Sequence, residues 1–169
     1  MEKKQDFLKL DIGCGPNKRP GHYGIDRLEY PCVDKVWDVG GDGLRFLEDG
    51  SADCVYASHL LEHVPFVPML REIHRVLKVG GTAEIYVPHG SSVAGYVDPT
   101  HIRPGYAFRT WDYVESGAYD LPSFRIVWRR LTSNLEATSS GSPGSSTIFL
   151  GFSNGTSPMP WEAVTRLVL

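Results

Sequence analysis

Short apolar segments alternate with glycine-rich and acidic segments along the first half of the chain. Four of these segments predict β-strands, namely residues 7–12, 22–26, 32–38 and 52–57. The second strand ends on Asp26 and the third on Asp38, whereas the fourth (ADCVYA) is a nearly unbroken apolar run. Such a run is typical of a strand in a parallel sheet that has helices on both faces. We therefore expect helices to cover this sheet from both sides.

The period of the apolar positions changes from strand to helix after residue 65. Phe66, Leu70, Ile73 and Leu77 form one apolar stripe at helical spacing, opposite a charged face. The glycines at 80 and 81 are expected to stop this helix.

The later segments continue the same alternation. A strand is predicted over 82–87, a loop rich in Gly, Pro and His over 88–105, a helix over 108–115 that ends near Gly117, and a strand over 124–131. Residues 137–160 are dominated by Ser, Gly, Thr and Pro and predict a long loop or lid, and the final TRLVL predicts a last strand. This order indicates a single α/β domain over residues 1–169, with a Rossmann-like, doubly wound and mostly parallel sheet.

Composition and charge narrow the classes of partner. A chain of 169 residues with 41% hydrophobic content can bury the core of one domain. Its net charge of −3, without a basic run, argues against binding to nucleic acid or to an anionic membrane. The three cysteines have no zinc-knuckle or redox spacing, which favours free thiols in a reducing compartment. We find no apolar leader and no long apolar run, and expect a cytoplasmic protein.

Acidic, glycine and serine residues follow several of the predicted strands. In an open parallel sheet, ligands bind outside the carboxyl ends of the strands. The residues at or just beyond those ends are Asp11, Gly13, Gly15, Asp26, Asp38 and Ser58. Acids before a loop are often only turn formers. Their combination with the glycines and the strand order favours a ligand site.

The segment DIGCGPNK differs from a dinucleotide-binding loop. Lys18 stands where that fingerprint has its third glycine. The link from Gly15 to Tyr23 is also too short for a normal crossover helix, whose N-terminus would hold pyrophosphate. Both differences argue against NAD as the ligand of this loop. A ligand without phosphates, such as S-adenosylmethionine, suits the loop better, with close backbone approach at the glycines, Asp26 on the ribose and Asp38 near the adenine.

The order of motifs is similar to that of a known family. LKLDIGCGPNKRPGHYGID, a following WD, DGSADCVYASHLLEHV and LREIHRVLKVGGTAEIYVP together resemble the class I S-adenosylmethionine-dependent methyltransferases, in the branch called methyltransferase type 11. The resemblance covers residues 7–115. It implies a seven-stranded sheet with an antiparallel strand near one edge. It also implies roles for individual residues: Asp11, Gly13 and Gly15 in the first cofactor motif, Asp26 on ribose, Asp38 near adenine, and Ser58 and His59 near the methionine end.

Two positions depart from the family pattern. Asn17 stands where many members have a third glycine, and the link to Asp26 is shortened.

A different interpretation applies to HLLEH at 59–63, which matches the inverted zinc peptidase motif. Because so short a motif matches by chance and lies where the methyltransferase resemblance has its own LEH segment, we predict no zinc hydrolase and no metal bound by this motif.

Candidate catalytic groups lie beyond the fourth and fifth predicted strands. His89, Asp98 and His101 could bind metal, act as a base for a substrate hydroxyl, or pin their loop by hydrogen bonds. Histidine has a pKa suited to a general base near neutral pH. We expect His101 or His59 to be that base, with Asp98 orienting it.

The acceptor is predicted only by class. The (Asn/Asp)-Pro-Pro-aromatic motif of many base and glutamine methyltransferases is replaced by SHLL, which favours an oxygen, carbon or small-molecule acceptor. The DPTHIRP loop resembles those of glycan and secondary-metabolite methyltransferases. Expected partners are therefore a small-molecule or glycan acceptor, with a homodimer left open. The alternative is a catalytically silent S-adenosylmethionine-binding subunit of a larger enzyme.

Overall fold

The computed structural model describes residues 7–132 and 162–168. The elements are β1 (Lys9–Ile12), β2 (Tyr23–Asp26), β3 (Lys35–Val36), α1 (Val39–Asp42), β4 (Ala52–Ser58), α2 (Phe66–Val76), β5 (Leu77–Pro88), α3 (Ala94–Val97), α4 (Thr110–Ser116), a 3₁₀ turn (Ala118–Asp120), β6 (Arg125–Thr132) and β7 (Glu162–Val168). The predicted lid over 137–160 lies outside the described residues. No helix in the described part of the chain has the length and apolar character needed to cross a membrane.

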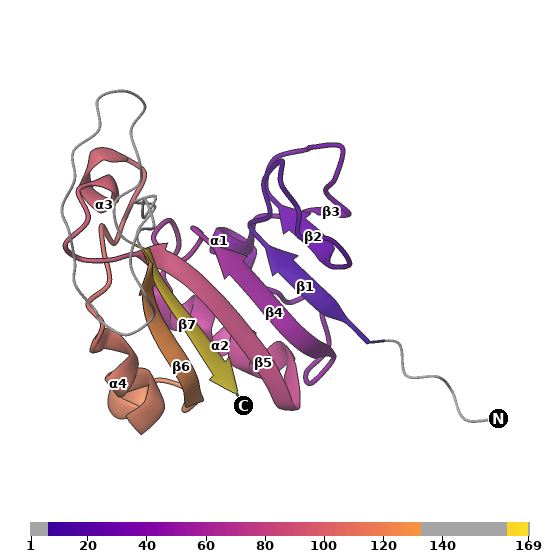
Figure 1. The fold of residues 1–169 in the computed structure, drawn as a ribbon. Helices are drawn as coiled ribbons and strands as arrows, with labels where there is room; N and C mark the ends of the chain where they lie inside the picture. Colours follow the sequence, from indigo (N-terminus) through magenta and orange to yellow (C-terminus); the bar gives the residue numbers. More distant parts are fainter. Residues whose placement is uncertain (1–6, 133–161, 169) are drawn as a thin grey trace, which may run out of the picture.

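The strands form one sheet in the order β3-β2-β1-β4-β5-β7-β6 (Figure 1). The pairs from β3 to β5 are parallel, and β7 runs antiparallel to both β5 and β6. The predicted Rossmann-like α/β class with a mostly parallel sheet is therefore confirmed. Because β1, β2, β3, β4 and β5 run in the same direction, the loops that follow them meet at one edge of the sheet.

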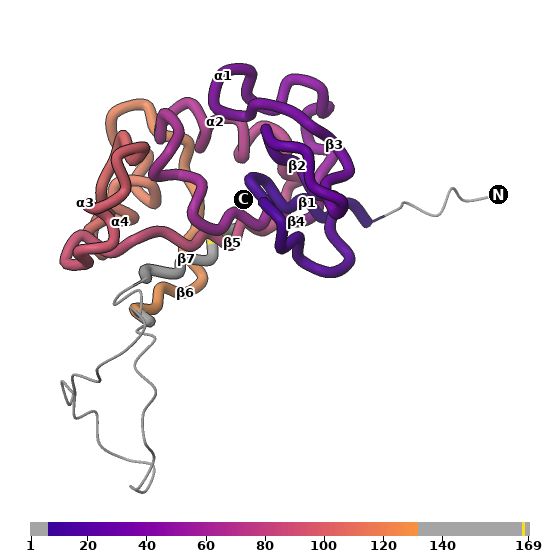
Figure 2. Tube along the Cα trace, turned by 90° about the horizontal axis from the view of Figure 1, so that it is seen from above, coloured from indigo at the N-terminus to yellow at the C-terminus, as the bar shows by residue number. Residues whose placement is uncertain are grey.

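The helices cover one face of the sheet. Leu10, Val55 and Ile85 point to that face and are fully buried. In Figures 1 and 2, α1 and α2 lie on the same side of the sheet. The helix α4 joins them there, because the ring of Trp111 packs edge-on against Phe66 of α2, with their centroids 6.1 Å apart.

The expectation of helices on both faces is wrong for the described part of the chain. Within β4, Asp53, Cys54 and Tyr56 are only half-buried, and no described helix covers them. Polar contacts replace apolar packing there. Asp53 accepts a hydrogen bond from the backbone N–H of Leu8, and the Arg19 guanidinium lies 4.3 Å from the Tyr56 ring centroid. The residues of ADCVYA are therefore divided between a buried face of the sheet and a face that is partly exposed to solvent.

The helix α2 confirms the predicted apolar stripe, with Leu70 and Ile73 fully buried. It ends earlier than predicted, at Val76, because Leu77 already has an extended backbone. The strand β5 therefore begins before the two glycines and is longer than the predicted 82–87. The glycine at 80 has a φ of +80° and lies within the strand.

Other element boundaries agree with the sequence to a few residues. The predicted helix over 108–115 is α4, which ends at Gly117 in the left-handed conformation with φ +64°. The strands over 124–131 and at the C-terminus are β6 and β7. The strand predicted over 32–38 is only the two residues of β3. The strand predicted over 7–12 begins at Lys9, because Phe7 lies exposed before it.

Candidate active site

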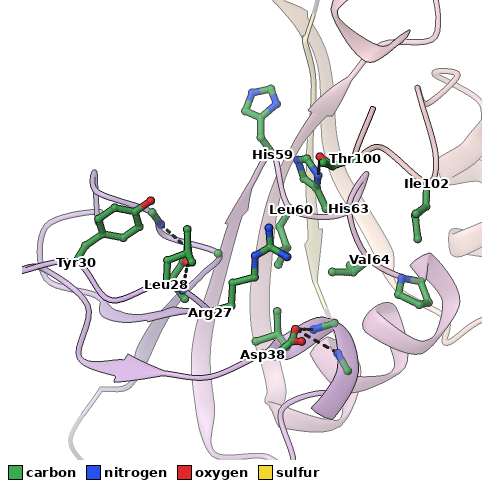
Figure 3. Close-up of a pocket in the computed structure, with 17 residues that line it drawn as sticks. Arg27, Leu28, Tyr30, Asp38, His59, Leu60, His63, Val64, Thr100 and Ile102 are labelled. Carbon is green, nitrogen blue, oxygen red and sulfur yellow. Dashed lines mark hydrogen bonds between the residues drawn. The ribbon is translucent and has the colours of Figure 1, made fainter. Parts of the chain in front are cut away.

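A cleft of about 540 Å³ opens at the carboxyl ends of the parallel strands (Figure 3). This volume lies in the usual range for small-molecule and cofactor sites. Glycines from the loop after β1 and from α1 form part of its wall, together with Asp26 and Asp38. The opposite wall contains His59 and His63 from the turn after β4, and Thr100 from the loop after β5. The cleft therefore combines residues from loops that the sheet topology brings together.

The loop after β1 places two glycines in the cleft wall. Gly13 and Gly15 have φ values of +69° and +52°, a region that glycine adopts without strain. A Cβ on Gly13 would lie 2.9 Å from Cδ1 of Leu60, whereas a Cβ on Gly15 would meet nothing within 4 Å. Gly13 thus packs closely against the neighbouring turn, and Gly15 leaves open space at the cleft.

Asp26 ends β2 and holds the glycine loop in place. Its Oδ2 accepts a hydrogen bond from the backbone N–H of Gly15 (2.8 Å), and its Oδ1 accepts one from that of Leu28 (2.9 Å). A carboxylate has about four lone-pair positions, so both oxygens keep acceptor capacity. Asp26 therefore lines the cleft as an oriented hydrogen-bond acceptor.

Asp38 lies at the N-terminus of the short helix α1. Its Oδ1 accepts hydrogen bonds from the backbone N–H groups of Gly40 (2.9 Å) and Gly41 (3.3 Å), so the side chain is the N-cap of this turn. A Cβ on Gly40 would lie 3.1 Å from Cγ1 of Val64. The turn-forming and ligand-binding readings of Asp38 are therefore compatible, because one oxygen caps the turn while the residue also lines the cleft.

Asp11 does not line the cleft but shapes its loop. The side chain is buried, and Oδ2 accepts a hydrogen bond from the backbone N–H of Arg19 (2.7 Å). Burial raises the pKa of this carboxyl group despite that bond. Cys14, between the two glycines, is also buried, and burial together with the nearby Asp11 and Asp26 charges raises its pKa to about 11. Cys14 therefore occupies a packing position in this loop.

The turn after β4 holds a strained histidine. His59 lines the cleft with a φ of +52°, which is uncommon for a residue with a side chain and is often found at functional sites. Its Nδ1 lies 3.1 Å from Oε1 of the buried Glu62. Residues 59–63 form a turn, so HLLEH does not present its histidines from one helix as the peptidase motif requires. Ser58 ends β4 outside the cleft lining.

His101 and Asp98 lie behind the cleft wall. The His101 side chain is only 8% exposed, and its Nδ1 lies 2.8 Å from the carbonyl oxygen of Gly95. Asp98 accepts hydrogen bonds from the backbone N–H and the hydroxyl of Thr100, so it pins the loop as one sequence reading expected. Neither residue is among those described as lining the cleft, whereas His63, to which the sequence assigned no catalytic role, is.

Several cleft residues had no signal in the sequence. Arg27, Leu28 and Tyr30 follow β2 and line the cleft, as does Thr100 (Figure 3). Their position follows from the path of the β2 to β3 connection, which local periodicity does not encode. His89, the third candidate of its loop, instead contacts the hydroxyl of Ser91 at 2.8 Å and does not belong to the described lining.

Comparison with known families gives a match at the centre of the chain. Residues 35–85 match the family described as "Methyltransferase domain". This segment contains Asp38, the strand β4, the turn with His59 and the helix α2, and so contributes residues to both walls of the cleft. No curated protein sequence matches the chain.

Solved structures share the whole fold. An S-adenosylmethionine-dependent methyltransferase from Archaeoglobus fulgidus aligns with a TM-score of 0.64 and 20% identity, over 98% of this chain and 87% of that one. The 1,6-didemethyltoxoflavin-N1-methyltransferase of Burkholderia thailandensis was solved with bound 1,6-didemethyltoxoflavin and S-adenosylhomocysteine. It aligns with a TM-score of 0.63 and 15% identity, over 95% of this chain and 70% of that one.

A third similar structure comes from an assembly. A chain of the complex between the Trm112 methyltransferase activator and a methyltransferase of Haloferax volcanii gives a TM-score of 0.58 and 13% identity, over 96% of this chain and 82% of that one. Together with the family match, these structures confirm the resemblance predicted from the sequence. The protein therefore has the fold of the class I S-adenosylmethionine-dependent methyltransferases and carries a methyltransferase domain segment at its centre.

Proposed function

We propose that the protein transfers the methyl group of S-adenosylmethionine to an oxygen or carbon atom of a small-molecule or glycan-type acceptor. The observation that carries this proposal is the cleft itself. It joins the positive-φ glycines 13 and 15 to the acids Asp26 and Asp38 at the carboxyl ends of successive parallel strands. This is the edge at which open α/β sheets bind ligands.

The residues in the cleft fit the two halves of this cofactor. Asp26 is oriented by the Gly15 N–H and would accept hydrogen bonds from the ribose hydroxyls. Asp38, fixed as the cap of α1, and the adjacent glycines would hold the adenine edge. Gly15 leaves room for the amino-acid tail, and His59 lies on the opposite wall, at the methionine end that the resemblance implies.

When bound, the cofactor supplies a methyl group on a positively charged sulfur, which is already electrophilic. The chain must then align the acceptor, exclude water and remove a proton where the acceptor is a hydroxyl. We propose His59 as the general base, because it lines the cleft and Glu62 orients its Nδ1. Of the two bases predicted from the sequence, His101 is the less accessible, since its side chain is 8% exposed.

The acceptor class rests on the sequence. The Burkholderia thailandensis structure contains a small heterocyclic substrate and is named for methylation at nitrogen, so the fold itself does not select an atom. The sequence SHLL after β4 and the DPTHIRP loop favour oxygen or carbon in a small molecule or glycan. Assays with hydroxylated and carbon-acid acceptors would distinguish these cases.

Calorimetric titration with S-adenosylmethionine and S-adenosylhomocysteine tests the cofactor assignment, with NAD as a negative control. We expect both sulfur compounds to bind and NAD not to bind. The Asp26→Ala substitution should weaken binding by about 1.5–3 kcal/mol, the range for hydrogen bonds to a charged group. Asp49→Ala removes an acid that is 81% exposed and lies outside the cleft lining, so it should not change the affinity. Equal affinity of wild type and Asp26→Ala would show that the ribose assignment is wrong.

A second candidate function is a cofactor-binding subunit whose catalytic groups come from a partner. The observation in its favour is the sheet face around Tyr56, which no helix of the described residues covers. Turnover by the purified chain with candidate acceptors separates the two. A catalytic chain methylates an acceptor alone, whereas a subunit binds S-adenosylhomocysteine and stays inactive until its partner is added.

A further inference from the structure

A cluster of metal-ligating side chains lies behind the wall formed by the turn after β4. Glu62, His63 and His101 each offer one ligand atom, and these atoms lie within 4.8 Å of one another. Backbone bonds join the two segments that carry them, because the N–H groups of Ile102 and Arg103 donate to the carbonyl oxygen of Glu62 at 2.9 and 3.2 Å. The cluster is therefore held by the fold rather than by one flexible loop.

The Glu62 carboxylate is fully buried and only half satisfied. Its Oε1 faces Nδ1 of His59 at 3.1 Å, but its Oε2 has no hydrogen-bond partner among the described residues. A buried polar atom without a partner costs about 1–3 kcal/mol, and more when it is charged. A bound cation would satisfy this oxygen.

The His101 ring is oriented as metal-ligating histidines usually are. Its Nδ1 lies 2.8 Å from the carbonyl oxygen of Gly95. A carbonyl only accepts, so Nδ1 carries the hydrogen and Nε2 keeps its lone pair. Asp98 Oδ2 is 3.7 Å from that Nε2, which is beyond hydrogen-bonding distance.

His63 has the same tautomer for a related reason. Its Nδ1 lies 3.0 Å from the Thr100 hydroxyl oxygen, and that hydroxyl donates its hydrogen to Asp98 Oδ1 at 2.7 Å. The hydroxyl can then only accept from Nδ1, which leaves the lone pair on Nε2. The two rings lie with their centroids 4.6 Å apart. One nitrogen of each ring and one Glu62 carboxylate oxygen lie within 4.8 Å of one another, and Nε2 is the nitrogen that keeps a lone pair in both rings.

We propose that Glu62, His63 and His101 bind a divalent transition-metal ion, with Zn²⁺ as the ion to test first. Two imidazoles and a carboxylate suit Zn²⁺ and related ions and disfavour Mg²⁺ or Ca²⁺. Bonds of about 2.0–2.2 Å place neighbouring tetrahedral ligands about 3.5 Å apart, so the ligand atoms must approach by about 1 Å. This ligand set differs from the peptidase reading of HLLEH, because His101 takes the place of His59.

The site adjoins the cleft, since His63 and Thr100 also line it (Figure 3). Three protein ligands leave a coordination position for an oxygen, and a divalent ion lowers the pKa of a hydroxyl bound to it. The ion would therefore help to deprotonate a hydroxylated acceptor. That role rests on the proposed function, whereas binding of the ion does not.

Zinc titration of the chelator-treated, tag-free full chain tests the site, with calorimetry and metal analysis as readouts. We expect one equivalent of bound Zn²⁺. The His63→Ala change alters an exposed residue and should leave the fold intact, yet raise the dissociation constant by at least about 100-fold. His22→Ala removes a histidine from the β1 to β2 loop, outside the cluster, and should leave affinity and stoichiometry unchanged.

A second variant tests the orienting hydrogen bond. Thr100→Val keeps all three ligands and should weaken Zn²⁺ binding by about 10- to 100-fold, as expected for an outer partner of a ligating histidine. Absence of zinc binding by the folded protein, or equal binding by wild type and His63→Ala, would overturn the site. Titration with S-adenosylhomocysteine in the presence of chelator tests cofactor binding without the metal. Loss of the metal site can therefore be distinguished from failure of the proposed function. Zinc binding without zinc-dependent turnover on a hydroxylated acceptor would remove only the catalytic role.

Discussion

Two glycines of the same loop have different physical reasons to be glycine. Gly13 and Gly15 both have positive φ, so alanine at either position carries a backbone strain of about 1–2 kcal/mol. Only at Gly13 does the added Cβ also overlap a neighbour, at 2.9 Å from Cδ1 of Leu60.

We expect Gly13→Ala to lower the free energy of unfolding by about 1–3 kcal/mol more than Gly15→Ala, because it adds overpacking to the shared strain. Urea denaturation of both variants measures the difference. Equal losses would mean that the contact with Leu60 relaxes without cost.

The Cys14 thiol should be nearly unreactive in the native protein at pH 8. Its raised pKa of about 11 leaves about one thiolate in a thousand at that pH, and the thiolate is the reactive form. In a Cys32→Ser/Cys54→Ser variant, the labelling rate of Cys14 should rise about tenfold per pH unit up to pH 10. Denaturant should raise the rate at pH 8, and labelling at the denatured rate in native buffer would contradict the burial of this thiol.

At the level of elements, one arginine joins α2 to the segment before β4. Arg75 donates hydrogen bonds to the carbonyl oxygens of Leu44 (3.0 Å) and Leu47 (2.9 Å) and forms an ion pair with Glu72. Glu72 in turn accepts from the backbone N–H of Leu44 at 2.7 Å. These bonds replace the regular secondary structure that residues 43–51 do not form.

The Arg75→Met substitution should lower the free energy of unfolding by about 1–3 kcal/mol, since it removes the arginine's hydrogen bonds to two carbonyl groups and its ion pair with Glu72. Arg71→Met is the matched control on the same helix. Arg71 is exposed and donates one hydrogen bond, to the carbonyl oxygen of Asp120, so its loss should cost less than about 0.5 kcal/mol. Similar small losses for both variants would show that the arginine network adds little.

The order of the longer elements could be predicted from sequence because these have strong local patterns, whereas the short helix α3 lies within the segment predicted as a loop over 88–105. The stripe of Leu70 and Ile73 identified α2, and the glycine at 117 identified the end of α4. The sheet topology then placed Asp26 and Asp38 on one edge. The approach of His63 to His101 could not be predicted from local sequence patterns, because that contact depends on backbone hydrogen bonds between two loops.

At the scale of the whole molecule, the described core lies on one side of the sheet. Ile85 is fully buried on the helix-covered face, whereas Cys54 is half-buried on the opposite face. The sequence could not distinguish these faces, because the apolar run of β4 predicted that both faces of the sheet would be buried. On the solvent-facing side of the sheet, polar contacts such as that of Arg19 with the Tyr56 ring come from segments distant in the sequence.

We expect Ile85→Ala to lower the free energy of unfolding by about 2–5 kcal/mol, the range for large-to-small changes in a packed core. Cys54→Ala should cost less than about 1 kcal/mol, since its neighbours already face solvent. Denaturation of both variants of the full chain is the measurement. A large loss for Cys54→Ala would show that another part of the chain or a partner covers the partly exposed face.

The loop between β1 and β2 also sets the sign of the electrostatic potential at the cleft. With a crossover helix, its N-terminus would present a partial positive charge to the ligand. Here the Gly15 N–H is already taken by the Asp26 carboxylate, and Asp38 adds a second acid to the lining. Arg27, which also lines the cleft, offsets one of these two acids, so the lining keeps an excess of one negative charge. That excess favours a cationic ligand over pyrophosphate. We therefore expect the cleft to select its ligand by charge as well as by shape, and a sulfonium ion has the favoured sign.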